Sequence, residues 1–184
     1  MNWNNLFESI KDTRHRVFIS YYHKDDEYYR NHFGELFGHL FINTSVKPGD
    51  IDTDLSTEYI KRLIQKGYIT GTSVVLFLVG AKTYCRKHVD WEISAGLNKK
   101  VGGYSGLLGL CLPTHPNYPQ DKYNPNTVPP RLVDNLKSGY ANFYDWTESE
   151  DSIKKWIEQA FQSRTDNADK IDNSREQFRY NRSE

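Results

Sequence analysis

Short apolar runs alternate along the chain with segments whose apolar residues recur at helical spacing. The most apolar run is 73–79 (SVVLFLV), and a continuous run of this kind is typical of a central parallel strand covered on both faces. Shorter runs at 17–22, 107–112 and 142–146 predict further strands, and Ile42 is expected to begin another short one.

The intervening segments predict helices. Asp25 and Asp26 follow the first strand and can begin a helix, since Asp is a favoured N-cap residue. Further helices are expected at 55–68, at 87–100 and from Ile153 onward, where apolar residues share one face. Strands that alternate with helices without an internal repeat predict an open α/β sheet, and such sheets bind ligands beyond the carboxyl ends of their strands.

Three segments lie outside this alternation. Apolar residues at helical spacing predict an N-terminal helical extension over 1–14, and a domain is expected over 15–162. Within the domain, 113–130 holds six of the seven prolines and is interpreted as a long loop, which often carries function. The last segment, 163–184, is polar and is expected to be a tail or a helix extension.

Composition narrows the function classes. The 24 basic and 24 acidic residues balance, so the chain lacks the basic excess of a nucleic-acid-binding protein. Aromatic residues make up 14% of the chain, which is too many for a disordered protein. There is no apolar run long enough to cross a membrane and no recognisable signal peptide, and two cysteines make no disulfide framework. We therefore expect a cytoplasmic protein with free thiols.

Glu92 is the strongest candidate for chemistry. It lies at the edge of the inward face of the predicted helix 87–100, beside His88, and near the strand ends where ligands bind. A carboxylate there is partly desolvated and can face a ligand. The alternative is a solvated glutamate at a helix edge. Ser20, Tyr21 and Tyr22 close the first strand and, with Asp25 and Asp26, form a second candidate. The favoured alternative for these residues is an N-cap and ordinary core aromatics.

Other motifs are weaker. Residues 80–83 resemble part of a phosphate-binding loop but lack its glycine spacing and its Gly-Lys pair, and no GxGxxG or GxSxG motif is present. A zinc site is conceivable because the pairs Cys85/His88 and Cys111/His115 both follow predicted strands. The favoured interpretation is one buried thiol in a strand, one cysteine at a helix start and two surface histidines, with no metal.

Taken together, these residues resemble a known family. VFISYYHKDD at 17–26 is similar to the first signature of TIR domains, and 43–54 occupies the place of their BB loop. The stretch 72–97 resembles the strand and helix that carry the catalytic glutamate, and Val89–Ile93 is similar to the TIR-like subunit of bacterial Thoeris anti-phage systems. The resemblance covers about residues 15–160 and implies the flavodoxin-like TIR fold, with a central parallel sheet and helices on both faces.

The resemblance also implies a reaction. TIR enzymes cleave the bond between nicotinamide and ribose in NAD, here the substrate rather than a cofactor, and Glu92 would stabilise the cationic transition state. Residues implied to bind the substrate are Ser20, Tyr21, Asp52, Asp54, Cys85 and His88. Many relatives have Trp in place of His88 and Asn in place of Cys85. Trp91 points away from the inward face and is expected to contact protein instead.

The implied partners follow from the same resemblance. Thoeris-type relatives transfer ADP-ribose to make a cyclic or conjugated nucleotide messenger, which activates a separate effector after a phage-derived trigger. Homo-oligomerisation is expected through 43–54. Two alternatives stay open. One is a non-enzymatic TIR scaffold, which would not need Glu92, and the other is an enzyme similar to nucleoside deoxyribosyltransferases, which would act on nucleosides.

Overall fold

A single parallel sheet organises the chain. The computed structural model describes residues 14–46, 56–65, 68–99, 103–119 and 122–183. Within them the strand order is β2-β1-β3-β4-β5, the order of flavodoxin-like sheets. The strands are β1 (Arg16–Ser20), β2 (Ile42–Asn43), β3 (Val74–Val79), β4 (Gly106–Cys111) and β5 (Asn142–Asp145). The predicted open α/β sheet is therefore confirmed.

The strand β3 lies at the centre of the sheet, as its apolar run predicts. Leu76 pairs with Ile19 of β1 on one side and with Leu108 of β4 on the other. All six residues of β3 are fully buried, because helices cover both faces of the sheet. Side chains of successive strand residues point to opposite faces, so every position in this strand needs an apolar residue.

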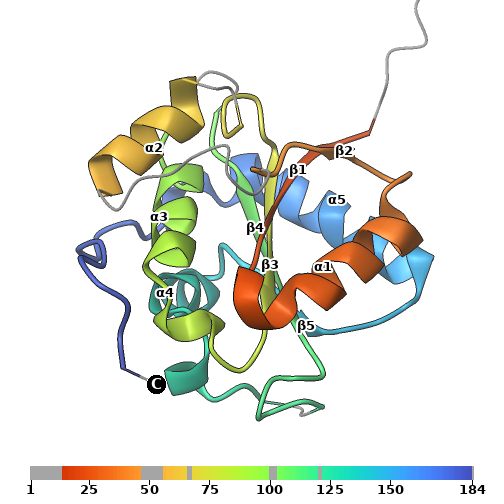
Figure 1. Cartoon of the computed structure of the whole chain (residues 1–184). Coiled ribbons are helices and arrows are strands. Elements are labelled where there is room, and N and C mark those ends of the chain that lie inside the picture. The colour runs from red at the N-terminus through yellow and green to blue at the C-terminus, as the bar shows by residue number, and fades with distance from the viewer. Residues whose placement is uncertain (1–13, 47–55, 66–67, 100–102, 120–121, 184) are drawn as a thin grey trace, which may run out of the picture.

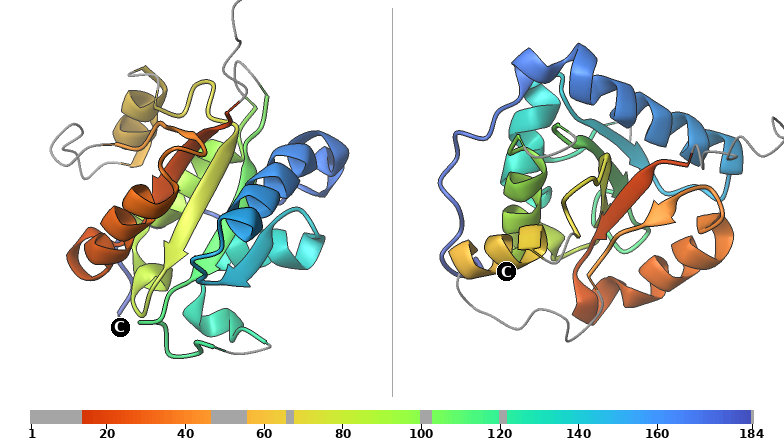
Figure 2. Two further views of the ribbon diagram at one scale, coloured as in Figure 1. Left: turned by 90° about the vertical axis from the view of Figure 1, so that its right-hand side faces the viewer. Right: turned by 90° about the horizontal axis from the view of Figure 1, so that it is seen from above.

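Two layers of helices cover the sheet (Figures 1 and 2). One face carries α1 (His23–Phe37) and α5 (Glu150–Asp166), and the other carries α2 (Ser56–Gln65), α3 (Lys87–Gly96) and α4 (Pro130–Ser138). Two clusters of buried residues match the two layers. In β1, Val17 and Ile19 belong to the cluster beneath α1 and α5, whereas Phe18 belongs to the cluster beneath α2, α3 and α4.

A glycine in β4 allows α5 to pack directly on the sheet. A Cβ atom at Gly106 would lie 1.7 Å from the backbone oxygen of Ala160 in α5. Any larger residue would push the helix away from the strand, so only glycine is compatible with this packing.

The structure corrects three expectations about helices. The helix α1 begins after Tyr22 without a side-chain cap, and Asp26 is instead buried in its first turn, where it accepts a hydrogen bond from Thr83 at 3.0 Å. The helix α3 ends at Gly96 and not at position 100. The helix α4 was not predicted, because it begins at the last proline of 113–130; proline is well tolerated in a first helical turn.

The proline-rich segment is held by hydrogen bonds in the part that the structure describes. His115 is almost fully buried, and its ring nitrogen Nε2 lies 2.9 Å from the carbonyl oxygen of Thr127. The backbone N–H of Asn117 donates to Nδ1 of the same ring at 3.1 Å. One histidine therefore links the two ends of the loop.

The chain after α5 runs back across the helical layer. Helix α5 continues to Asp166, past the expected domain boundary at 162, and residues 171–183 then follow α4 and α3 toward the C-terminus (Figure 1). We call residues 171–183 the C-terminal strap. Phe178, in the middle of the strap, is 7% exposed.

Some expectations fall outside the described residues. These are the helix over 1–14, except for Arg14, and most of the loop 43–54. In the residues that are described, no helix has the length and apolarity needed to cross a membrane.

Candidate active site

Glu92 lies on the face of α3 that is turned toward β1 and α2. Only 7% of the residue is exposed. The hydroxyl group of Tyr59, in the first half of α2, donates a hydrogen bond of 2.5 Å to its Oε1 atom. The helix-edge position predicted from spacing therefore places a carboxylate inside the protein, with a defined hydrogen-bond donor.

Ser20 forms a second wall of the site. It is the last residue of β1 and is 1% exposed. Its hydroxyl is close enough to Glu92 to favour the ionised carboxylate. It does not reach the geometry of a hydrogen bond, and its oxygen has no hydrogen-bond partner among the described residues. A buried hydroxyl of this kind is available to a ligand.

Burial controls the protonation of Glu92. Loss of solvent raises its pKa from 4.5 to about 7, although the hydroxyls of Ser20 and Tyr59 favour the ionised form and limit the rise. The pKa of Tyr59 is raised as well, first by burial and then by the negative charge of Glu92. At neutral pH the carboxylate is therefore poised between its two protonation states.

Tyr21 and His88 surround this pair. Tyr21 is 7% exposed, and its pKa is raised mainly by burial, with the charge of Glu92 among the smaller causes. The His88 ring is half-buried, with its centroid 5.0 Å from that of Tyr59 and 4.9 Å from that of Trp91. The structure thus brings Ser20, Tyr21 and His88 into the surroundings of Glu92, as the sequence predicts.

Cys85 is held in a short 3-10 turn before α3. Its thiol donates to the carbonyl oxygen of Lys82 at 3.1 Å, and its own carbonyl accepts a hydrogen bond from the backbone of Arg182 in the C-terminal strap. These contacts give Cys85 a role in shaping the turn that leads into α3. Its predicted contact with substrate stays a prediction.

The loop that begins at position 43 leaves the fold beside the site. The Ser45 hydroxyl accepts a hydrogen bond of 2.7 Å from the backbone of Ile19, next to Ser20, and Val46 packs against the buried cluster that contains Tyr59. Asp52 and Asp54 lie outside the described residues, so their predicted binding role is not tested here.

The proposed alternative of a zinc site finds no support. His115 is not the surface histidine expected from the sequence: it is buried, because both of its ring nitrogens are engaged within the proline-rich segment. Burial and Asp145 together raise the pKa of the Cys111 thiol to about 12. In the part of the chain that the structure describes, no group of three His, Cys, Asp or Glu side chains is placed to hold a metal ion.

Tyr59 is the site residue that sequence reasoning missed. Tyr59 lies within the helix predicted over 55–68, where it shares one apolar face with its aliphatic neighbours, and this pattern does not set it apart from them. The available signal was its hydroxyl group, because a buried tyrosine usually needs a hydrogen-bond partner. Nothing in the spacing identifies that partner as Glu92, which lies 33 positions further along the chain.

A comparison with known protein families identifies the family of the chain. Residues 18–117, more than half of the chain, match the model of the TIR-like domain of the Thoeris protein ThsB. The chain belongs to this family. A search of curated proteins found no match. The family assignment confirms the TIR fold and makes the chain a TIR domain of the Thoeris defence type.

The matched region of this ThsB-type TIR domain contains the whole candidate site. Ser20, Tyr59 and Glu92 all lie within residues 18–117. The elements α4, β5 and α5 and the C-terminal strap lie outside the match.

Proposed function

We propose that this TIR domain cleaves the bond between nicotinamide and ribose in NAD and transfers the ADP-ribose group to form a signalling nucleotide. The observation that carries the proposal is the environment of Glu92. The carboxylate is buried and accepts a hydrogen bond from Tyr59, and the Ser20 hydroxyl, which has no hydrogen-bond partner among the described residues, stands beside it at the end of β1.

This environment suits a cationic substrate. Among the described residues, no positively charged side chain forms an ion pair with Glu92. A pyridinium ring, or the sugar cation that forms when nicotinamide leaves, would therefore supply the missing charge. An attraction between opposite charges is strongest where water is excluded.

The reaction needs one carboxylate and no acid. Nicotinamide departs as a neutral base from a positively charged ring, so no proton has to be given to the leaving group. As the bond between C1′ and the ring nitrogen breaks, positive charge develops on the ribose, and ionised Glu92 stabilises it. Tyr59 holds the carboxylate in place, and the free Ser20 hydroxyl can bind a ribose oxygen.

The fate of the sugar cation depends on what reaches it. Water would give ADP-ribose, whereas a nucleophile held in a dry site would give a cyclic or conjugated product. We propose the second outcome, with the product acting as a messenger to a separate effector after a phage-derived trigger. Tyr21, His88, Cys85, Asp52 and Asp54 are proposed to line the substrate site.

Assembly is part of the proposal. We propose that copies of the chain associate through 43–54, so that the loop of one copy adjoins the site of the next. Its described first part supports this, because Ser45 accepts a hydrogen bond from the backbone of Ile19 and the segment therefore begins beside the site.

A matched pair of variants tests the reaction. Wild-type protein, Glu92→Gln and Glu176→Gln are each incubated with NAD, both purified and in lysate from phage-challenged cells. Nicotinamide and ADP-ribose products are followed by mass spectrometry. Glu176 has a side chain that is 83% exposed, so its variant controls for loss of one carboxylate.

We expect triggered product from wild type and Glu176→Gln, and at least about 100-fold less from Glu92→Gln. Normal product formation by Glu92→Gln would contradict the assignment of Glu92. Absence of product under every triggered condition, with full phage protection by Glu92→Gln, would instead favour a scaffold.

A further inference from the structure

The helix that carries Glu92 does not cap its own first turn. The N-cap residue, Arg86, has extended backbone and makes no side-chain capping hydrogen bond. The acceptor comes from the C-terminal strap, where Oδ1 of Asn181 accepts a hydrogen bond from the backbone N–H of Lys87 at 2.9 Å. This amide oxygen accepts a hydrogen bond from the first turn of α3 as an N-cap side chain would, although Asn181 and Lys87 are 94 residues apart in the sequence.

The strap also binds the two residues that precede Glu92. The indole N–H of Trp91 donates to the carbonyl oxygen of Phe178 at 2.7 Å. The backbone N–H of Phe178 donates to Oδ2 of Asp90 at 2.9 Å. One residue of the strap therefore makes a hydrogen bond through each of its backbone groups to consecutive residues of α3, and Trp91, which is fully buried, contacts protein as the sequence predicts.

Further contacts extend along the helix. The side-chain amide of Gln177 donates to the hydroxyl of Ser94 at 3.0 Å, and that of Asn173 donates to the Ser94 carbonyl at 3.2 Å. Asp90 is fixed from another side by Arg131 of α4, at 2.9 Å. The contacts of the strap thus span α3 from Lys87 to Ser94.

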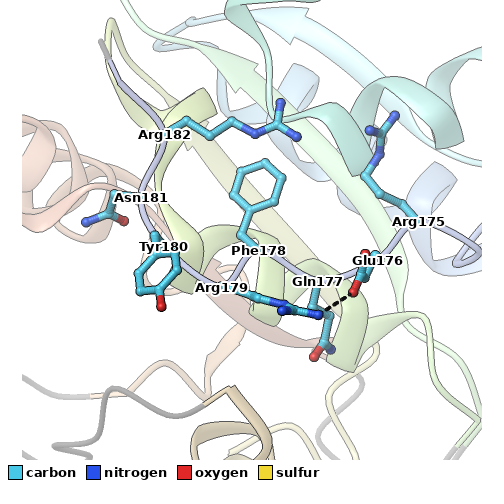
Figure 3. Close-up of a pocket in the computed structure, with 8 residues that line it drawn as sticks. All are labelled: Arg175, Glu176, Gln177, Phe178, Arg179, Tyr180, Asn181 and Arg182. Carbon is cyan, nitrogen blue, oxygen red and sulfur yellow. Dashed lines mark hydrogen bonds and ion pairs between the residues drawn. The ribbon is translucent and has the colours of Figure 1, made fainter.

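One side of the C-terminal strap packs against α3, and its other side is exposed to solvent, which we call the open side. Figure 3 shows the Phe178 ring pointing into the hollow formed by the curve of the strap, while Tyr180 points away from it. The guanidinium of Arg182 lies 4.0 Å from the centre of the Phe178 ring. Tyr180 is 80% exposed, and the Arg179 side chain is also 80% exposed, so these two residues offer controls that leave the anchors intact.

The contacts that the strap makes with Asp90 and Trp91 affect Glu92 because all three residues belong to the same helix. Successive residues of an α-helix are separated by about 100° around its axis, so Asp90 and Trp91 leave α3 on sides different from Glu92. Fixing these two residues sets the rotation of the helix about its axis. That rotation decides where the Glu92 carboxylate lies relative to Tyr59 and Ser20.

We propose that the C-terminal strap is a positioning element for catalysis, which holds α3 from outside so that Glu92 meets Tyr59 and Ser20 on the inside. This inference rests on the proposed function of Glu92. Phe178 and Asn181 are its positioning residues, and neither contacts the reacting atoms.

The test combines three strap variants with a readout that does not depend on activity. Asn181→Ala removes the capping oxygen and Asn181→Asp retains one. Phe178→Ala removes the buried ring in the middle of the strap, while its backbone groups can still bond to Asp90 and Trp91. Arg179→Ala is the control on the open side. The ionisation of Glu92 is followed in the whole protein by carbon-13 NMR of glutamate carboxyl groups, with Glu92→Gln giving the assignment, and folding is checked by thermal unfolding.

Asn181→Ala and Phe178→Ala are expected to lower the pKa of Glu92 by about half a unit or more, because water gains access to a looser helix. In triggered assays kcat should fall about threefold to tenfold, with less change in KM for NAD. Asn181→Asp and Arg179→Ala should resemble wild type in both measurements.

Two results would overturn the positioning role. One is an unchanged Glu92 titration in folded Asn181→Ala and Phe178→Ala, and the other is an equal shift in Arg179→Ala. Failure of the proposed reaction would be seen separately, as absence of product in the wild type, and would leave the titration result intact.

Discussion

Two buried carboxylates stand two positions apart on α3 and have opposite surroundings. Asp90 is 2% exposed and Glu92 is 7% exposed. Asp90 receives the guanidinium of Arg131 at 2.9 Å and the backbone N–H of Phe178 at 2.9 Å. Glu92 receives one hydroxyl, from Tyr59.

The different surroundings of the two carboxylates suit different roles, a structural one for Asp90 and a reactive one for Glu92. A buried charge is costly unless it is paired and hydrogen-bonded. Asp90 meets both conditions and joins α3, α4 and the C-terminal strap. Glu92 forms no ion pair with a cation among the described residues, so its burial raises its pKa to about 7 and leaves the carboxylate able to respond to a positively charged ligand.

Removing Asp90 should produce the largest change in stability. In Asp90→Ala the fully buried guanidinium of Arg131 loses its charged partner and keeps only the neutral acceptors of Asn173 among the described residues, of which Oδ1 lies at 2.8 Å. Breaking a buried pair from one side typically costs about 3–5 kcal/mol in the free energy of unfolding. Chemical denaturation measures this loss. Asp134→Ala is the control, because Asp134 pairs with Arg175 in a less buried bridge and should cost under about 1 kcal/mol. Equal losses in the two variants would refute the contrast.

Removing the charge of Glu92 should instead raise the stability of the protein above neutral pH. Glu92 has a pKa of about 7 in the folded protein and 4.5 without its surroundings, so the folded state keeps a proton that the unfolded state loses between these pH values. Stability therefore falls as pH rises from about 4.5 to 7.

Glu92→Gln should escape this loss and be more stable than wild type by up to about 3 kcal/mol at pH 8. At pH 5 the difference should shrink to under about 1 kcal/mol. Denaturation at the two pH values measures it, and Glu176→Gln should show no such dependence. A destabilised Glu92→Gln at pH 8 would mean that the carboxylate is stabilised by groups not described above.

The sequence predicted those features of the fold that are local. The continuous apolar run of β3 and the helical spacing around Val89 and Ile93 were enough to place the central strand and α3. The position of Glu92 at a helix edge followed from the same spacing. Each of these depends on residues within a few positions of one another, which is the range over which periodicity carries information.

Contacts between distant segments could not be predicted in this way. The bond from Tyr59 to Glu92 and the bond from Lys87 to Asn181 depend on how separate elements pack. The polar sequence of 163–184 predicts a tail or a helix extension. The structure shows that one large residue of the strap, Phe178, is buried, and a single buried residue makes no periodic pattern. Polar segments that are held by hydrogen bonds rather than by an apolar face show no period.

The smallest expected effect concerns the hydrogen bond that Tyr59 donates to Glu92. Tyr59→Phe removes a donor that favours the ionised carboxylate, so the pKa of Glu92 should rise above about 7. The reactive form is the ionised one, and kcat/KM in triggered assays should therefore increase with pH through about 7 in wild type and through a higher pH in the variant.

At pH 7 the Tyr59→Phe rate should be about threefold to tenfold lower, and much of it should return above pH 8. Tyr140→Phe is the matched control, since Tyr140 is also buried and donates to the Ser105 carbonyl at 2.7 Å, away from Glu92. Both variants lose a buried hydroxyl, and only the loss beside Glu92 should move the pH profile. A profile that moves equally in the two would show that general loosening of the core, and not the bond to Glu92, sets the ionisation of the carboxylate.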